Sequence, residues 1–205
     1  GLLALAAIAI VAWVVPPQPA ARHGAVPVPF AQVLRDPELL RLNVGIFALH
    51  AILMALFVVV PLALVRSGLP AVSHSWMYLA AVGIGFVFML PFVAIRSVAV
   101  HERAVFLGAV AVLAVGLCVL ALASDALWLL AAGLVIFFAA FNVLEAKLPA
   151  LVSKAAPPAA KGAASGVYSS VQFLGTFVGA AAGGAIAQHL GPVAVLATCL
   201  ALAAF

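Results

Sequence analysis

The sequence predicts an all-α membrane protein, and three observations lead to this fold class. The chain is 68% hydrophobic and 7% charged, whereas soluble domains carry about 25% charged residues. The stretch from Gly162 to Phe205 holds no Lys, Arg, Asp or Glu. The apolar runs are long and do not alternate with polar residues, which favours membrane-crossing helices over a β-barrel. Inside a bilayer a helix pairs its backbone polar groups within itself.

Seven apolar stretches are predicted to be helical, and helix-breaking or charged residues separate them. They lie at residues 2–15, 42–65, 76–95, 104–123, 126–148, 162–189 and 193–205. The first and the last are too short to cross a hydrocarbon core of about 30 Å at roughly 1.5 Å per residue. We therefore expect five complete spans and two partial ones, and a chain that is a fragment of a larger membrane protein.

The boundaries of these helices follow from local chemistry. Proline at positions 16, 17 and 19 ends the first helix and opens a connector at 16–36. Asp36 suits the N-cap of the second helix, because its carboxylate can accept from free backbone N–H groups. Ser124-Asp125 is expected to cap the fifth helix and Pro149 to end it. Gly191-Pro192 turns the chain into the last helix.

Lys and Arg are distributed unequally between the connectors. Eight of the nine precede or flank the second, fourth and sixth helices: Arg22, Arg35, Arg41, Arg96, Arg103, Lys147, Lys154 and Lys161. The alternate connectors hold only Arg66. By the positive-inside rule, the linker at 16–36 faces the cytoplasm and the turns at 66–75, 124–125 and 189–192 face outward. No basic cluster with interleaved aromatic residues accompanies the net charge of +4, so a nucleic-acid partner is not expected.

The second helix offers candidates for a substrate or proton pathway. Asn43, His50 and Met54 recur at helical spacing and share one face. An ionisable side chain at this depth is costly, and it usually faces protein or a wet cavity. Histidine titrates near physiological pH, which suits proton transfer. The alternative is a neutral histidine that forms a hydrogen bond across a helix interface.

A second polar spot lies on the fifth helix, where Asn142 and Glu145 fall on one face with phenylalanines. Glu145 could take up a proton or take part in a gate. The alternative is a structural ion pair at the membrane edge, with Arg41 or Arg96.

The sixth helix carries a polar stripe and a glycine stripe. The polar stripe consists of Ser165, Ser169, Gln172 and Thr176, and Gln172 joins the pathway candidates. Glycines recur every four residues, at Gly162 and Gly166 and again at Gly175, Gly179 and Gly183, which permits close helix packing. Besides static packing, the helix could form a sliding interface with a partner domain.

Two further patterns bear on fold and function. Gly45 and Pro61 have the same spacing as Gly133 and Pro149, on helices that run in opposite directions. The match suggests an inverted three-helix repeat, an arrangement that secondary transporters commonly have. Metal-binding, phosphate-binding and catalytic motifs are absent from the sequence, so no enzyme activity, cofactor or metal is expected. Both cysteines lie in apolar runs and are interpreted as packing residues.

Two stretches resemble a known family. FFAAFNVLEAKLPALVSKAAPPAAKGAASGVYSSVQFLGTFVGAAAGGAIAQHLG, residues 137–191, is similar to the tenth and eleventh helices of major facilitator superfamily transporters. LNVGIFALHAILMALFVVVPLAL, residues 42–64, is similar to their seventh helix. The likeness is strongest to the YajR-type drug/proton antiporters of that superfamily.

The resemblance implies the C-terminal six-helix half of a major facilitator fold, truncated at both ends and built from inverted three-helix repeats. Residues 1–15 would end helix six, 16–41 would hold the central cytoplasmic linker and the start of helix seven, and 42–205 would form the C-terminal transmembrane domain. The cavity or its mouth would hold His50, Asn142 and Glu145. The candidates for the interface between halves and its gate are Lys161, Gly162, Ser165, Gly166, Ser169 and Thr176.

The expected function is proton-coupled efflux of small amphipathic molecules by alternating access, in a bacterial inner membrane. The expected partners are the lipid bilayer, the substrate, protons and an N-terminal six-helix half. The alternative is a non-transporting bundle that serves as an assembly or interaction partner. That alternative predicts that His50 and the polar stripe are buried against helices of this same chain.

Overall fold

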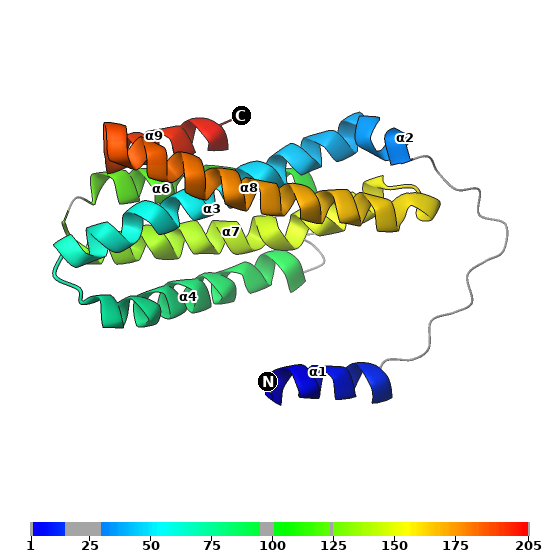
Figure 1. The fold of residues 1–205 in the computed structure, drawn as a ribbon, viewed down its shortest axis with the longest axis horizontal. Coiled ribbons are helices and arrows are strands. Elements are labelled where there is room, and N and C mark those ends of the chain that lie inside the picture. The colour runs from blue at the N-terminus through cyan, green and yellow to red at the C-terminus, as the bar shows by residue number, and fades with distance from the viewer. Residues whose placement is uncertain (1, 15–29, 95–100, 124, 205) are drawn as a thin grey trace.

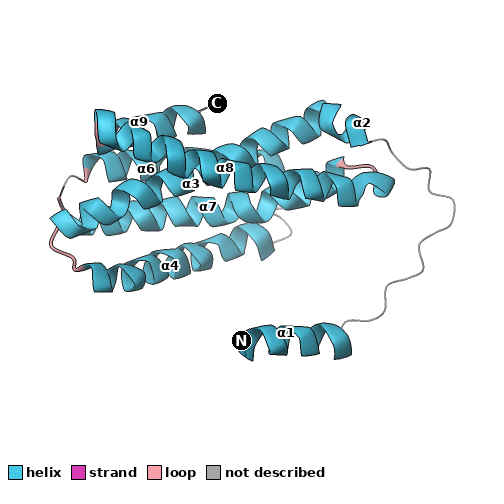
Figure 2. Cartoon of the chain, viewed as in Figure 1, coloured by secondary structure: helices cyan, strands magenta, loops and turns pink. Residues whose placement is uncertain are grey.

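A computed structural model describes residues 2–14, 30–94, 101–123 and 125–204, and no strand occurs within these ranges (Figure 2). The helices are α1 (Leu2–Trp13), α2 (Phe30–Arg35), α3 (Pro37–Arg66), α4 (His74–Ala94), α6 (Glu102–Leu122), α7 (Leu127–Ala155), α8 (Lys161–Leu190) and α9 (Pro192–Ala203). Two 3-10 turns, η1 (Ala71–Ser73) and η2 (Pro158–Ala160), join them. Five helices, α3, α4, α6, α7 and α8, are long and apolar enough to cross a membrane. The predicted fold class is confirmed.

Helix α7 is the centre of the bundle. It packs against α4 and against α6, and α3 packs most extensively against α8 while also contacting α7. Helix α9 contacts α3, α6 and α8. Helix α1 lies apart from the bundle in Figure 1, and its side chains from residue 4 onward are exposed.

The two ends of the bundle differ in which helix termini they gather. The beginnings of α3, α6 and α8 and the ends of α4 and α7 lie together (Figure 1). There the ammonium of Lys154 pairs with the carboxylate of Glu102, which ties α7 to α6. At the opposite end Nε of Arg66 lies 3.4 Å from Oδ1 of Asp125. Five described basic residues of the predicted cytoplasmic set lie at or beside the helix termini of the first end: Arg35, Arg41, Arg103, Lys154 and Lys161.

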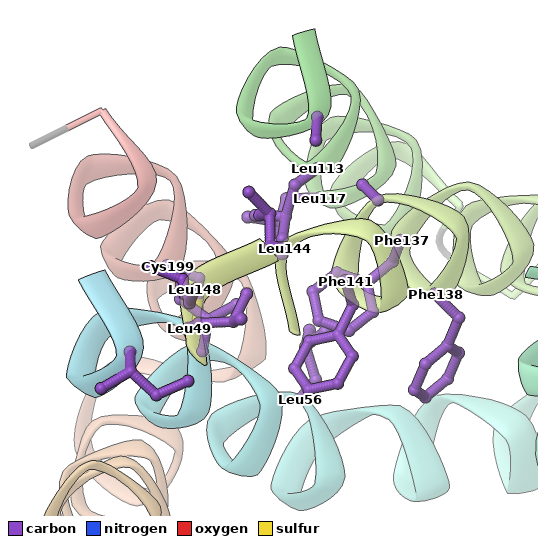
Figure 3. Close-up of a cluster of buried hydrophobic side chains, with 14 of the residues drawn as sticks. Leu49, Leu56, Leu113, Leu117, Phe137, Phe138, Phe141, Leu144, Leu148 and Cys199 are labelled. Atoms are coloured by element: carbon purple, nitrogen blue, oxygen red, sulfur yellow. The ribbon is translucent and has the colours of Figure 1, made fainter. Parts of the chain in front are cut away.

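The hydrophobic core is built on the buried side of α7. Phe137, Phe138 and Phe141 pack with ring centroids 5.4–6.2 Å apart. The core continues from these rings to leucines of α3 and α6, and Cys199 of α9 lies beside Leu148 and Leu49, as Figure 3 shows. Burial of Cys199 agrees with its interpretation as a packing residue, whereas Cys118 is exposed on α6.

Glycines set the closest helix contacts. A Cβ added at Gly85 of α4 would lie 2.7 Å from the backbone of α7, and one added at Gly116 of α6 would lie 2.8 Å from it. On α8, a Cβ at Gly175 would lie 2.4 Å from the carbonyl oxygen of Phe47, and Gly183 also faces α3. Three of the main helix pairs therefore approach too closely for any side chain at these positions.

The structure corrects three predicted boundaries. Helix α7 does not end at Pro149 but continues to Ala155, with the proline inside it. Ser124 lies outside the described residues, and Asp125 does not cap α7, whose N-cap is Ala126; the carboxylate faces Arg66 instead. The last residues of the predicted connector, Phe30–Arg35, form a helix of their own.

Asp36 caps α3 as the sequence predicts. Its Oδ1 accepts from the backbone N–H groups of Glu38 at 2.9 Å and Leu39 at 3.0 Å. We expect Asp36→Ala to lower the free energy of unfolding by about 1 kcal/mol, because two donors lose their acceptor. Thermal unfolding in detergent measures this, with Asp125→Ala as the control, since an exposed ion pair contributes less. Equal losses in the two variants would contradict the assignment of the cap.

Candidate functional site

Three polar side chains meet between α3, α7 and α8, and we call them the polar site: His50, Glu145 and Gln172. Nε2 of Gln172 lies 2.8 Å from Nε2 of His50 and donates to Oε1 of Glu145 at 3.1 Å. Nε2 of His50 lies 3.8 Å from Oε2 of Glu145, within the range of an ion pair when the imidazole is protonated. One side chain of the site comes from each of the three helices.

The helices place these groups deep in the spans. His50 is buried near the middle of α3, with 9% of its surface exposed, and Nδ1 of its ring lies 3.3 Å from the carbonyl oxygen of Ile46. The ring of Phe141, one turn before Glu145 on α7, lies 5.7 Å from the imidazole. The side chain of Glu145 keeps 36% of its surface exposed, so the polar site is open on that side.

Two oxygens near the polar site remain unpaired. Within the described residues, neither Oε2 of Glu145 nor the hydroxyl of Tyr168 forms a hydrogen bond to another protein group. Tyr168 lies one turn before Gln172 on α8, so it shares that face of the helix. A buried polar atom without a partner is costly. The site therefore has unused capacity to bind a proton or a polar group.

Other pathway candidates do not join the three. Nδ2 of Asn142 points to α4 and donates to the carbonyl oxygen of Val82 at 3.5 Å. Asn43 is buried about two turns before His50 on α3, and Met54 is half-buried one turn after it. The predicted face of α3 exists, but it brings only His50 to Glu145 and Gln172.

Of the two arginines suggested as ion-pair partners of Glu145, only Arg41 lies within the described residues. Arg96 lies outside the described residues, and Arg41 is exposed and forms no salt bridge with Glu145 in the described part of the chain. Glu145 contacts His50 and Gln172 instead. An (i, i+3) or (i, i+4) pattern within one helix cannot reveal such a contact, because it joins residues far apart in sequence.

The polar stripe of α8 divides into two parts. Ser165 and Ser169 are exposed, as are Lys161, Gly162 and Gly166, and a Cβ at either of these glycines would have no neighbour within 4 Å. Gln172 is half-buried in the polar site. The hydroxyl of Thr176 donates to the carbonyl oxygen of Gln172, within α8 itself. One face of the first half of α8 is thus an exposed small-residue surface, whereas Ala164, Val167 and Tyr168 on its other face are buried.

A separate cavity of about 540 Å³ lies between α3, α6, α7 and α9. Its walls are apolar, with Arg41 as the charged residue among those that line it. None of the three residues of the polar site lines this cavity. The cavity and the polar site are therefore different features of the bundle.

Comparison with known proteins adds to this geometry. The sequence matches the Major Facilitator Superfamily over residues 1–180. It is 41% identical over 165 residues to the inner membrane transport protein YajR of Escherichia coli (strain K12), an alignment that covers 78% of this chain. The same alignment covers 36% of that relative, so the chain spans about a third of the relative's length.

Proposed function

Because the chain belongs to the Major Facilitator Superfamily of membrane transporters, we propose that it acts in proton-coupled efflux of small amphipathic molecules by alternating access. In this proposal residues 1–15 end the sixth helix of the whole transporter, and 16–41 hold the linker and the start of the seventh. Residues 42–205 form the C-terminal transmembrane domain, which works together with an N-terminal six-helix half in the lipid bilayer.

The contact of His50 with Glu145 through Gln172 is the observation that supports proton coupling. Two ionisable groups within 3.8 Å of each other lie deep between spanning helices. Such groups are costly in a membrane and usually belong to an ion or proton pathway. The structural alternative, a neutral histidine in a helix interface, describes the hydrogen bond to Gln172 but leaves Oε2 of Glu145 unexplained.

The exposed face of the first half of α8 supports the proposed contact with an N-terminal half. Its surface is made of Lys161, Gly162, Ser165, Gly166 and Ser169, which are small or hydrophilic rather than lipid-like. Glycine and serine at such spacing allow two helices to approach and to slide. The alternative function, a non-transporting bundle, predicts that His50 and the polar stripe are buried within the chain. His50 is buried as that alternative predicts, whereas the exposure of Ser165 and Ser169 favours a contact with a further domain.

The proposed orientation places the end that holds Lys154 and Lys161 in the cytoplasm. We expect a cysteine in place of exposed Lys154 to react with a membrane-impermeant maleimide only in permeabilised cells. A cysteine in place of exposed Asp125 should react in intact cells. Both variants carry Cys118→Ser and Cys199→Ser to remove background labelling. Reaction of both positions from the same side would contradict the orientation.

Efflux from vesicles tests the proposal as a whole. The full-length protein is reconstituted, and export of the fluorescent amphipathic cation ethidium is followed with and without an imposed pH gradient. We expect export that is faster with the gradient and stops when an ionophore dissipates it. Export that ignores the gradient would reject proton coupling, and a lack of any export would reject this class of substrate.

A further inference from the structure

The hydrogen positions in the polar site follow from the groups that face each ring nitrogen. The carbonyl oxygen of Ile46 can only accept, so Nδ1 of His50, at 3.3 Å, carries the hydrogen. In a neutral imidazole the other nitrogen, Nε2, is then an acceptor. The amide nitrogen of Gln172 lies 2.8 Å from it and can only donate. The assignment is chemically consistent and describes His50 in its neutral form.

We propose that Gln172 is a positioning residue that competes with the proton for the lone pair on Nε2 of His50. An N–H group of the amide occupies the same lone pair that a proton would use, so the two cannot be bound together. This inference rests on the proposed proton site and assigns Gln172 control over the pH at which that site loads.

When His50 is protonated, Glu145 replaces Gln172 as the hydrogen-bond partner of its Nε2. Its Oε2 lies 3.8 Å from Nε2 of His50 and has no hydrogen-bond partner in the described part of the chain. Once Nε2 carries a hydrogen it can donate to this oxygen, and a charge-assisted bond of this kind is stronger than a neutral one. The amide of Gln172 must then leave Nε2, because two donors would face each other. Protonation thus moves the bond of His50 from α8 to α7.

No other charged or titratable group of the described residues is placed to accept a hydrogen bond from protonated His50. Of the described side chains packed against His50, Glu145 of α7 is the one within ion-pair distance. Tyr168 lies on the α8 face, one turn before Gln172, and its hydroxyl has no partner in the described residues. Arg41 on α3 and Lys147 on α7 form no salt bridge with either His50 or Glu145 in the described ranges.

Titration of His50 tests the inference without any substrate. The full-length protein, labelled at its histidine rings, is titrated by NMR, and the His50 signal is assigned as the one lost in His50→Gln. Gln172→Met removes the donor at similar length, and we expect the midpoint of the His50 signal to rise by roughly one pH unit. Gln172→Glu, which can accept from the protonated ring, should raise the midpoint further. Gln188→Met, an exposed glutamine near the end of the same helix, is the matched control and should leave it unchanged.

Gln172 contacts both His50 and Glu145, and a double variant tests which of the two contacts causes the shift. Because the competition takes place at Nε2, the rise caused by Gln172→Met should persist when Glu145→Gln is also present. The inference is overturned if Gln172→Met leaves the midpoint unchanged or lowers it, or if its effect vanishes in the Glu145→Gln background. These outcomes are separate from ethidium export, which decides the proposed function: export can prove independent of the pH gradient while the titration still shifts.

Discussion

Glu145→Gln in the full-length transporter should abolish accumulation driven by a pH gradient while leaving exchange of ethidium across the membrane intact. Glutamine keeps the shape of the side chain and an oxygen for the N–H of Gln172, at 3.1 Å from Oε1 in the wild type. It has no negative charge to stabilise a protonated His50, 3.8 Å away, and it cannot bind and release a proton itself. If one proton exchanges for one ethidium cation, a gradient of one pH unit sustains about a tenfold concentration ratio. In the variant this ratio should fall to about one.

The measurement compares gradient-driven accumulation with exchange between equal internal and external concentrations of ethidium. Glu102→Gln is the matched control, because it neutralises another acid that pairs with Lys154 at the end of the bundle, away from the polar site. Accumulation in Glu145→Gln that equals the wild type would remove Glu145 from the proton pathway. Loss of exchange as well would assign it to substrate binding instead of coupling.

Gly179→Ala should destabilise the bundle more than any other single methyl group added to α8. The new Cβ would lie 2.2 Å from the carbonyl oxygen and 2.5 Å from Cα of Ala51, and both belong to the backbone of α3. Neither atom can turn aside, so the two helices must separate. Overpacking costs about 1–3 kcal/mol, and this case lies at the upper end. For a chain of this size, that corresponds to a fall in melting temperature of roughly 6–12 °C.

Gly184→Ala is the control for this substitution, since a Cβ there would meet nothing within 4 Å. Melting is followed by circular dichroism in detergent. The separation of α3 from α8 should also lengthen the contact of His50 with Gln172, because His50 directly precedes Ala51. If both alanine variants melt at the same temperature, α3 and α8 do not approach as closely as described.

The sequence predicts the helices well because the signals are local. A run of apolar residues, a capping aspartate or a Gly-Pro turn acts within a few residues, and the starts of α3 and α8 are where these signals place them. Pro149 is misread for a related reason. Proline stops a helix when no other contacts hold the next turn, but α7 packs within the bundle on both sides of Pro149, where Leu148 before it and Val152 after it are buried.

The polar site is predicted only in part, because its formation depends on contacts between distant segments. His50, Glu145 and Gln172 each stand out alone, as polar residues in apolar runs. Their meeting depends on the packing of α3 against α8, where Gly175 and Gly179 bring the backbones together. The sequence shows those glycines, but it does not say which helix they face. Gly85 of α4 and Gly116 of α6 likewise allow their helices to approach the backbone of α7 closely. Neither belongs to a repeat of glycines at four-residue spacing, so no pattern in the sequence singles them out.

The continuation of α7 through Pro149 has a mechanical consequence for the residue four positions earlier. Proline has no N–H, so the main-chain carbonyl of Glu145 lacks its usual donor within the helix. The backbone hydrogen bonding of α7 is therefore interrupted at Glu145, the residue whose side chain contacts His50. After this interruption the last turns of α7 carry Lys154, which forms an ion pair with Glu102 of α6. A bend of α7 at Glu145 would move these last turns and, through the ion pair, the beginning of α6 with them.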